Sequence, residues 1–517
     1  MTISLSPFRN EPFTPWDADN RRAFETALKN VRAISNEVHS MWIDGEDIVD
    51  RPLFDSVDPS DPMHVVGRFP TGTVNDVDRA IAAAVRTFPA WSKTPIEKRA
   101  QYLLEAAKRM RERKHQFSAR MVYEVGKNWP EADGDTAEAI DFLEFYAREA
   151  LRYAEGAPVT PVAGERNELI YIPLGAGVVI PPWNFPLAIL VGMTSAALVT
   201  GNTVVLKPAS ESATIASDFV KLMREVGIPA GVLNFITGPG GKLGDRLVSN
   251  PNVRFVAFTG SKEVGIDINE KAAKVQPGQI WLKRTVLEMG GKDAIIVDKD
   301  CDLDTAVAGV AAAAFGYQGQ KCSACSRAIV DNAVYDEFVK KLKVEVEKID
   351  VGPAERNPKM GPVVSERARK KILEYMDHGK REGKLLTGGG AAPGPGWFLQ
   401  PTVFVDIPEK GKLAQEEIFG PVLAVIRAKD FDDALAIANN TEFGLTGAVY
   451  TNDEKKLSRA REEFHVGNLY LNRKCTGALV GAHPFGGFNM SGTDSKAGGR
   501  DYLALFLQGK TVSKKVS

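Results

Sequence analysis

Cysteine is scarce in this sequence, which has only four in 517 residues. So few cysteines in so long a chain do not suggest a disulfide framework, and they favour the reducing cytoplasm. The six histidines show no metal-ligand spacing, and the pair Cys322 and Cys325 lacks the second pair that a zinc site of this type needs. We therefore expect a cytoplasmic protein with no metal centre.

The sequence also has almost no net charge, since Lys and Arg number 65 while Asp and Glu number 66. A chain with this balance has no overall field that would attract nucleic acid or an anionic membrane. The first residues lack the basic and apolar regions of a signal peptide. We expect neither nucleic acid nor membrane among the partners.

One long segment, residues 169–206, contains no Asp, Glu, Lys or Arg. Its length alone would suffice for a membrane span. However, helix-breaking residues interrupt it repeatedly, at Pro173, Gly175, Gly177, Pro181, Pro182 and Pro186. We therefore predict buried core, formed by successive pieces of strand, loop and helix.

Apolar runs of strand length and of helix length alternate along most of the chain. The predicted strands are 175–180, 203–206, 232–236, 254–258, 294–297 and 327–330. The predicted helices are 19–38, 75–88 (ending before Pro89), 136–153 (after Pro130), 187–200, 212–226, 243–249, 303–314, 334–348 and 366–382. Prolines predict extended edge strands near residues 158–171. The alternation predicts an α/β fold with a doubly wound parallel sheet, and its return after residue 285 predicts a second α/β domain.

The candidate nucleophile is Cys322, in a stretch rich in glycine. An Ala- and Val-rich run at residues 305–314 predicts a buried helix, and Gly316 and Gly319 then break the helical pattern. The cysteine is therefore expected on a turn beside a packed element. An ionised thiol there attacks a carbonyl carbon well and can later leave from a thioester. Taken alone, the commoner role of such a cysteine is that of a small buried apolar residue.

Two polar residues lie in or just after the charge-free segment. Asn184, in Pro-Trp-Asn-Phe-Pro, is an amide held between aromatics and prolines, and it could donate to an oxyanion. A simple turn explains that motif equally well. Lys207 ends a predicted strand, and open α/β sheets bind ligands at the carboxyl edge. An ordinary strand-end lysine is the commoner case.

Three further stretches could contribute to a site. Glu288, followed by Met-Gly-Gly-Lys, ends a predicted strand and is a general-base candidate, although a solvated turn glutamate is more frequent. Phe-Thr-Gly-Ser at residues 258–261 opens a helix and could offer N–H groups to a phosphate, but it is not the dinucleotide fingerprint Gly-x-Gly-x-x-Gly. Glu417 and the glycine-rich loop around Phe485 predict, on their own, only packed loops.

Taken together, these stretches resemble the NAD(P)-dependent aldehyde dehydrogenase superfamily. The motifs occur in the family's order: Pro-Trp-Asn-Phe-Pro, Lys-Pro-Ala, Phe-Thr-Gly-Ser, Glu-x-Gly-Gly-Lys, Gly-Gln-x-Cys, Glu-Glu-Ile-Phe-Gly-Pro and Pro-Phe-Gly-Gly. The resemblance covers nearly the whole chain after about residue 45. It implies a Rossmann-like cofactor domain, a second α/β catalytic domain and a small β oligomerisation extension.

The resemblance also implies roles for individual residues. Cys322 attacks the aldehyde carbon, Asn184 and the Cys322 backbone N–H hold the oxyanion, and Glu288 activates the water that hydrolyses the thioester. The cofactor-binding residues carried over are Trp183, Lys207, Ser210, Thr259, Gly260, Ser261, Glu417 and Phe419. Family members that prefer NAD often have Glu where Ser210 stands, so the resemblance implies NAD and leaves NADP open.

Around the nucleophile and in the loop near residue 477, the sequence resembles the subgroup that oxidises L-glutamate 5-semialdehyde, the open form of Δ1-pyrroline-5-carboxylate, in proline degradation. In that subgroup the amino-acid end of the substrate meets Ser323 and the backbone amides of Gly477 and Ala478. Phe185 and Phe485 would enclose the aliphatic chain. Two other hypotheses stay open: a dehydrogenase for another small acid semialdehyde such as succinate semialdehyde, and a non-catalytic structural relative.

The resemblance divides the chain into functional segments and implies a homodimer or a higher homo-oligomer. The expected segments are an N-terminal arm with the helical part of the cofactor domain (1–153), oligomerisation strands (154–173), the NAD-binding domain (174–287), the catalytic domain (288–475), a return to the cofactor domain with the active-site loop (476–504) and an oligomerisation tail (505–517).

Overall fold

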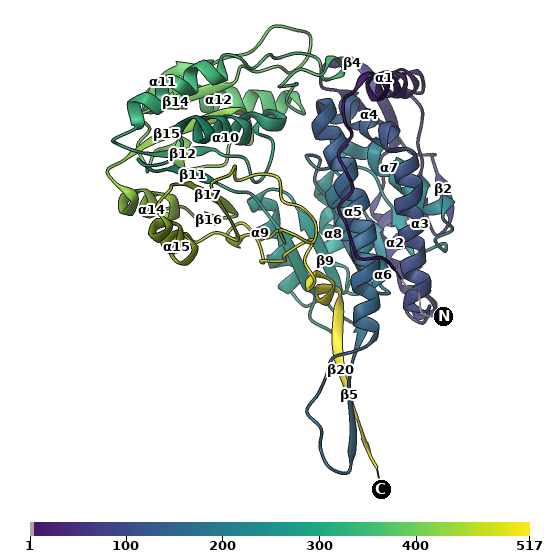
Figure 1. The fold of residues 1–517 in the computed structure, drawn as a ribbon. Coiled ribbons are helices and arrows are strands. Elements are labelled where there is room, and N and C mark those ends of the chain that lie inside the picture. Colours follow the sequence, from purple (N-terminus) through teal and green to yellow (C-terminus); the bar gives the residue numbers. More distant parts are fainter. Residues whose placement is uncertain (1–4, 517) are drawn as a thin grey trace.

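The computed structural model describes residues 5–516, the side chain of Lys242 excepted. Two α/β bodies lie side by side, and a two-stranded ribbon projects from one of them (Figure 1). Each body is built on a seven-stranded sheet with helices packed against it. The predicted α/β class, with a parallel sheet in each body, is confirmed.

The helices of the described residues are α1 Ala18–Ala33, α2 Val74–Trp91, α3 Ile96–Glu112, α4 Lys114–Val125, α5 Trp129–Ala154, α6 Ala188–Val199, α7 Ala213–Glu225, α8 Gly240–Ser249, α9 Lys262–Ala273, α10 Leu303–Phe315, α11 Tyr335–Val346, α12 Glu366–Glu382, α13 Lys412–Gln415, α14 Phe431–Asn439 and α15 Glu454–Glu463. Short 3-10 turns are η1 Ser210–Ser212, η2 Gly316–Gly319, η3 Ala354–Arg356 and η4 Tyr502–Phe506.

The strands are β1 Met41–Ile43, β2 Glu46–Ile48, β3 Leu53–Asp58, β4 Asp61–Pro70, β5 Glu165–Pro173, β6 Ala176–Ile180, β7 Thr203–Leu206, β8 Leu233–Phe235, β9 Phe255–Thr259, β10 Arg284–Glu288, β11 Ala294–Val297, β12 Arg327–Asp331, β13 Lys384–Thr387, β14 Thr402–Val405, β15 Val422–Ala428, β16 Phe443–Gly444, β17 Thr446–Tyr450, β18 Asn468–Leu471, β19 Phe488–Asn489 and β20 Leu507–Lys515.

The first sheet has the order β10-β9-β6-β7-β8-β1-β2. The five strands from β10 to β8 are parallel, and β1 and β2 join antiparallel at one edge. The chain runs outward from β6 through β7 to β8 and then crosses to β9 on the other side of β6. Open sheets of this kind bind ligands where the strand order reverses, outside the carboxyl ends of the strands. That point lies between β6 and β9.

The second sheet has the order β13-β14-β15-β12-β11-β17-β18, and β13 alone is antiparallel. Only residues 289–293 join β10 of the first sheet to β11 of the second. Because both strands belong to parallel sheets, this short link brings the carboxyl edge of one sheet to the amino edge of the other. Strand ends from both bodies therefore meet at one junction.

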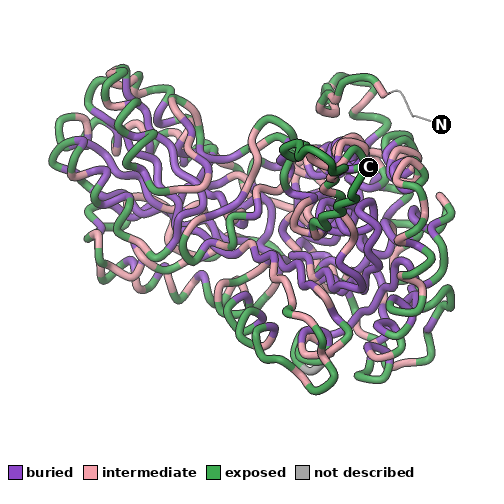
Figure 2. The backbone as a smooth tube through the Cα atoms, turned by 90° about the horizontal axis from the view of Figure 1, so that it is seen from below, coloured by how far each residue is buried: buried purple, intermediate pink, exposed green. Residues whose placement is uncertain are grey.

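The charge-free segment is core, as predicted. It forms the end of β5, then β6, α6 and β7, and every residue of α6 except Ile189 is buried. A helix that is apolar on all sides fits such a place, because α6 is packed between its own sheet and α5. Figure 2 shows the buried backbone running through both bodies, while the ribbon near the C-terminus is exposed. No helix of the described residues is long and apolar enough to cross a membrane.

Three boundaries predicted from prolines are wrong. α2 continues through Pro89 to Trp91, since the proline sits in the last turn and removes only one hydrogen bond. Pro130 lies inside the first turn of α5, where its missing N–H has no helical partner in any case, and Asn128 caps that turn. Residues 158–161, predicted as part of an edge strand, are outside any strand, and β5 begins at Glu165.

The first helix is also shorter than the predicted 19–38. It ends at Ala33, and Asn36 then takes a left-handed backbone conformation with φ of 69°. This turn brings Val38 into a bridge with Arg68. The pattern of helical apolar residues did not reveal this pairing, because its partner lies in the distant strand β4.

We predict that Gly177→Ala destabilises the first sheet. The Cβ of an alanine at this position in β6 would overlap the ring of Phe255, which is fully buried and packed on Phe506. Overpacking of this kind costs about 1–3 kcal/mol, so the midpoint of thermal unfolding should fall. The matched control is Gly244→Ala in α8, where a Cβ has nothing within 4 Å; alanine there should be neutral or stabilising. Equal melting temperatures for the two variants would contradict the packing argument.

Candidate active site

The residues predicted to form a site lie along the carboxyl edge of the first sheet. Trp183 and Asn184 follow β6, Lys207 follows β7, and Ser261 follows β9. Glu288 is the last residue of β10, and it is in register with Thr259 of β9. Parallel strands end at the same edge, so residues far apart in the sequence are brought together there.

The Cys322 segment reaches this edge from the second body. α10 ends at Phe315, and Tyr317 and Gln318 then take left-handed conformations with φ of 48° and 56°. Buried hydrogen bonds hold this turn: the Tyr317 hydroxyl donates to the Val125 carbonyl at 2.9 Å, and the Gln318 amide donates to the Pro362 carbonyl at 2.6 Å. A backbone conformation rare for these residues is thus fixed by surrounding structure, as is common at functional sites.

Two contacts join the segments of the three predicted catalytic residues. The Asn184 side chain donates to the Gln320 carbonyl at 3.1 Å, two residues before Cys322. The chain that follows Glu288 passes so close to the nucleophile loop that a Cβ on Gly291 would lie 2.6 Å from the Cys322 carbonyl oxygen. The structure therefore brings Asn184, Glu288 and Cys322 to the same junction.

Glu288 is held by the segment before the 3-10 turn η4. Its Oε1 accepts from the Ser495 hydroxyl at 2.6 Å, and the Ser495 backbone N–H lies 3.4 Å away. Burial raises the pKa of Glu288 to about 7, and these hydrogen bonds and the charge of Lys496 oppose the rise. A carboxyl group with this pKa exchanges protons near neutral pH, which is the range that suits a general base.

Cys322 as a residue is partly exposed, but its thiol is buried, and the pKa of the thiol is raised well above the ordinary value. Burial is the main cause, and the negative charges of Asp293, Glu288 and Glu417 add to it. The charges of these carboxyl groups act on the thiol, so their ionisation opposes ionisation of the sulfur. The thiol is therefore protonated at neutral pH until a base or a positive charge acts on it.

The predicted cofactor residues form two groups. The first group lies at the carboxyl edge of the first sheet and includes Lys207, which is buried and donates to the Pro208 carbonyl at 3.2 Å. Burial lowers the pKa of Lys207 to about 8. No carboxylate of the described residues forms an ion pair with its ammonium. Ser210 begins η1, and Ser261 caps α9 by accepting from the Val264 N–H at 3.4 Å. Gly260 is packed against Phe258, with no room for a side chain.

The second group comes from the loop before β15. Glu417 accepts from the Gly291 N–H at 3.0 Å, and burial raises its pKa to about 7. A Cβ on Gly290 would overlap the same carboxylate. Phe419 meets Trp183 edge to face, with ring centroids 5.4 Å apart. This contact joins the loop of the second body to the loop after β6.

Apart from Phe185, the predicted substrate residues lie on the nucleophile turn and in the long loop after β18. Ser323 is buried, and its carbonyl oxygen lies 3.3 Å from the Cys475 sulfur, which ties the nucleophile turn to the loop after β18. In that loop Gly477 is exposed with φ of 83°, and the Arg473 guanidinium donates to its carbonyl at 3.1 Å, while Ala478 is half-buried. Phe485 pairs with Ala497 through two backbone hydrogen bonds.

The sequence reasoning missed a buried cation beside this site. The ammonium of Lys127 lies 4.1 Å from the ring centre of Phe185 and 4.5 Å from that of Tyr317, and it forms an ion pair of 2.8 Å with Asp135. Asp135 also accepts from the Ala188 N–H at 2.6 Å, at the start of α6. The available signal was a lysine directly after the helix-ending Gly126, where a buried charge is uncommon.

Four other residues of the junction were not singled out from the sequence as site residues: Lys292, Asp293, Gln320 and Ser495. Lys292 is fully buried, and burial together with the nearby Arg327 charge lowers its pKa to about 7. It directly follows the glycines of the Glu288 motif, so that motif offered a signal for it. Ser495 gave no signal, because its proximity to Glu288 arises only in the folded chain.

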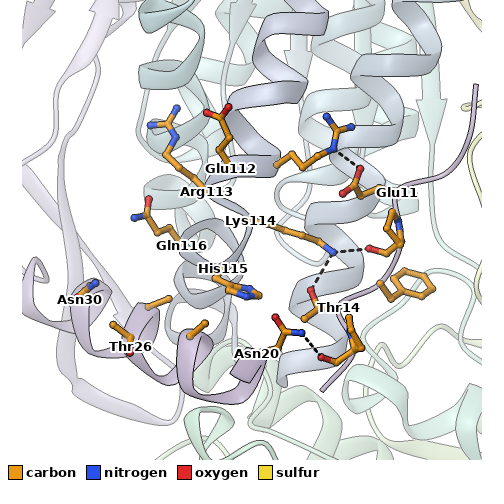
Figure 3. Close-up of a pocket in the computed structure, with 16 residues that line it drawn as sticks. Glu11, Thr14, Asn20, Thr26, Asn30, Glu112, Arg113, Lys114, His115 and Gln116 are labelled. Atoms are coloured by element: carbon orange, nitrogen blue, oxygen red, sulfur yellow. Dashed lines mark hydrogen bonds and ion pairs between the residues drawn. The ribbon is translucent and has the colours of Figure 1, made fainter. Parts of the chain in front are cut away.

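A separate cavity of about 550 Å³ lies beneath the N-terminal arm, between α1 and the α3–α4 junction (Figure 3). None of the predicted site residues lines it. Its basic groups already have partners, since Arg111 pairs with Glu11 at 2.7 Å and Lys114 with Asp133 at 3.0 Å. The arm is thus fastened to α3 by an ion pair and to α5 by hydrogen bonds from Thr14 to Asp133, and the cavity offers no free cation for a ligand among the described residues.

Comparison with known proteins agrees with the family resemblance of the sequence motifs. Residues 42–512 match the model of the family described as the aldehyde dehydrogenase family. A 1-pyrroline-5-carboxylate dehydrogenase of Anoxybacillus flavithermus is 54% identical over 512 residues, which cover 99% of each chain. The structure of 1-pyrroline-5-carboxylate dehydrogenase from Thermus with bound NAD has a TM-score of 0.98 and 49% identity, and covers 99% of this chain and 100% of that one. Betaine aldehyde dehydrogenase from Staphylococcus aureus, in complex with NAD+, has a TM-score of 0.89 and 29% identity, and covers 96% of this chain and 98% of that one.

We predict that Lys127→Met lowers the free energy of unfolding by about 3–5 kcal/mol, because it leaves the buried Asp135 carboxyl without its counter-charge. Burial already raises the pKa of Asp135 in the folded chain. The loss in free energy of unfolding should therefore grow as pH rises above the ordinary carboxyl pKa. In that range Asp135 ionises in the unfolded state but stays protonated in the folded state, which favours unfolding. Urea unfolding at pH 6 and pH 8 checks both points.

The matched control is Lys370→Met, which breaks an exposed ion pair with Glu366. Exposed pairs contribute about 0–1 kcal/mol. A similar small loss in both variants would show that the Lys127 pair is not the buried constraint described above.

Proposed function

Because this chain belongs to the aldehyde dehydrogenase family, we propose that it oxidises L-glutamate 5-semialdehyde to L-glutamate with NAD as the hydride acceptor, in the degradation of proline. The observation that carries this proposal is the convergence of Asn184, Glu288 and Cys322 at the junction of the two sheets. The 54% identity to a 1-pyrroline-5-carboxylate dehydrogenase, over nearly the full length of both chains, supports the choice of substrate.

In the proposed reaction, Cys322 loses its proton and its sulfur bonds to the aldehyde carbon. Two donors stabilise the resulting oxyanion, the Asn184 amide and the Cys322 backbone N–H. The Asn184 amide has two N–H bonds, and its bond to the Gln320 carbonyl uses one and orients the other. Burial raises the pKa of the thiol, so its proton passes to solvent water as the sulfur attacks.

When bound, NAD supplies the acceptor for the hydride of the adduct, and a thioester on Cys322 remains. Glu288 then takes a proton from water while the water oxygen bonds to the thioester carbon. The carbon–sulfur bond breaks, and the carboxylic acid leaves. The three residues are thus assigned to nucleophile, oxyanion donor and base.

The residues at the sheet edge fit a dinucleotide. The buried Lys207 ammonium has no carboxylate partner among the described residues, and Ser261 begins α9 at the point where the strand order of the first sheet reverses. Helix N-termini and buried ammonium groups both favour phosphate and hydroxyl ligands. We assign Trp183, Thr259, Gly260, Glu417 and Phe419 to the same cofactor.

Ser210 carries no charge that would repel a 2′-phosphate, so we infer that NADP is accepted besides NAD. We assign the substrate's amino-acid end to Ser323, Gly477 and Ala478, and its aliphatic chain to Phe185 and Phe485. The Lys127 ammonium contacts the face of the Phe185 ring and thereby supports that wall.

We propose the functional division predicted from the resemblance, with the NAD-binding domain at 174–287 and the catalytic domain at 288–475. The β1–β2 hairpin, outside the first of these ranges, is part of the same sheet. The exposed β5–β20 ribbon has apolar side chains at Ile170 and Val512. We infer that a second copy of the chain covers it, in a dimer or a higher assembly. The four free cysteines support a cytoplasmic location.

We expect kcat/KM for L-glutamate 5-semialdehyde to exceed that for succinate semialdehyde. Ser323, Gly477 and Ala478 are assigned to the amino-acid end of the substrate, and succinate semialdehyde has no α-amino group there. Steady-state assays with both aldehydes and NAD measure the ratio. A higher value with succinate semialdehyde would move the assignment to that substrate. No activity with either aldehyde, in a folded protein, would favour a non-catalytic role.

We also expect Glu288→Gln to release one equivalent of NADH per active site and then to turn over at least about a hundredfold more slowly, because hydrolysis loses its base while hydride transfer remains. Stopped-flow absorbance and mass spectrometry of the trapped acyl-enzyme test this. Glu366→Gln, on the exposed face of α12, is the control. Loss of the NADH burst in Glu288→Gln would remove this residue from the role of base in hydrolysis.

In the wild-type enzyme the rate of thioester hydrolysis should rise about tenfold from pH 6 to pH 8, since ionisation of a base with pKa about 7 is required.

A further inference from the structure

Ser495 is the closest hydrogen-bond partner of Glu288, and none of the motifs that suggested the site includes it. Its hydroxyl donates to Glu288 Oε1 at 2.6 Å, and its backbone N–H approaches the same oxygen at 3.4 Å. The nearby Gly487 N–H acts with Ser495 against the rise in the pKa of Glu288 that burial causes. Ser495 is itself buried, with 5% of its surface exposed, so water does not compete freely for the hydroxyl.

Backbone pairing with the end of β10 places Ser495 beside Glu288. Residues 491–493 run antiparallel to the end of β10, where Met289 donates to the Ser491 carbonyl at 2.8 Å and Thr493 donates to the Leu287 carbonyl at 2.9 Å. Glu288 itself forms an isolated bridge with Gly492. The backbone of Glu288 and the backbone that carries Ser495 are therefore fixed relative to each other, and the hydroxyl–carboxyl contact does not depend on a mobile loop.

The two oxygens of Glu288 have different surroundings. Oε1 has the Ser495 contacts, whereas Oε2 is buried and has no hydrogen-bond partner among the described residues. A buried carboxyl oxygen without a partner is uncommon, and such an atom is often the place of a water or a substrate atom. The asymmetry leaves Oε2 as the oxygen available for a proton.

We propose that Ser495 is a positioning residue that holds Glu288 through Oε1 so that Oε2 acts as the base in thioester hydrolysis. This inference rests on the proposed function. In the step concerned, a water molecule gives one proton to Oε2 while its oxygen bonds to the thioester carbon, and the carbon–sulfur bond breaks with the electron pair going to Cys322. The proton on Oε2 then passes to the sulfur or to solvent, so the charge and atoms balance.

The hydroxyl also stabilises the ionised form of the base. A donor to the charged form of a carboxyl group favours ionisation, so the Ser495 contact keeps Glu288 available as a carboxylate near neutral pH. The other charged or titratable groups that act on this carboxyl are Lys496, Cys322 and Tyr502.

The test compares Ser495→Ala with Ser495→Thr in the full-length enzyme. Removing the donor should raise the apparent pKa of the hydrolysis step by about one unit, since one hydrogen bond to a charged group is lost. At pH 7 the hydrolysis rate of Ser495→Ala should then fall about fivefold, and at pH 9 it should approach the wild-type rate. The single-turnover burst of NADH should persist, because hydride transfer precedes the step. Ser495→Thr keeps the hydroxyl and should restore the wild-type pH profile.

A second measurement does not depend on turnover. Difference infrared titration of the protein without substrate, with Glu288→Gln as the reference, reports protonation of this carboxyl directly and should show the same upward shift in Ser495→Ala. An unchanged titration, or a rate that falls equally at every pH, would overturn the inference and leave Ser495 with a packing role only. If wild type forms no acyl-enzyme at all, the proposed function fails instead, and the infrared titration still decides whether Ser495 sets the ionisation of Glu288.

Discussion

The short link between the two sheets is the constraint on which the rest of the site depends. Residues 289–293 carry the chain from the carboxyl end of β10 to the amino end of β11. Gly290 lies against the Glu417 carboxylate and Gly291 against the Cys322 carbonyl, so neither position has room for a side chain. Because the link is short and closely packed, it fixes the distance between the two bodies at the point where the reacting groups meet.

The electrostatics of the site follow from that close approach. Glu288, Glu417, Asp293 and the Cys322 thiol all have raised pKa values, and burial is the first cause in each case. The nearby Lys292 has a lowered pKa for the same reason. Glu288, Glu417 and Lys292, which would be fixed charges in water, therefore have pKa values of about 7 here. This is the condition that acid–base chemistry at neutral pH requires.

Sequence reasoning reached the parts of the fold and site that depend on local patterns. The strand at 203–206 and the helix at 366–382 have the predicted bounds, because short apolar runs and an Asp/Glu/Lys/Arg-rich amphipathic face are local signals. Asn184, Glu288 and Cys322 were found through their motifs, and their convergence follows from the parallel order of the strands. Their catalytic roles remain proposals.

Residues whose importance comes from distant partners could not be predicted in this way. Ser495 meets Glu288 across 207 residues of sequence, and Lys127 meets Asp135, Phe185 and Tyr317 on three different segments. Pro89 and Pro130 show the opposite failure, in which a strong local signal was given too much weight, since both lie in terminal turns of helices that tolerate them.

The pairing of β5 with β20 has a consequence for biosynthesis. β5 is complete at residue 173, but its only strand partner among the described residues ends at residue 515. The Asn202 side chain and Arg284 likewise bond carbonyls between residues 504 and 507. During translation β5 must therefore wait, with its pairing edge open, until β20 has left the ribosome. A chain that stopped before β20 would leave that edge permanently unpaired and prone to association with other chains.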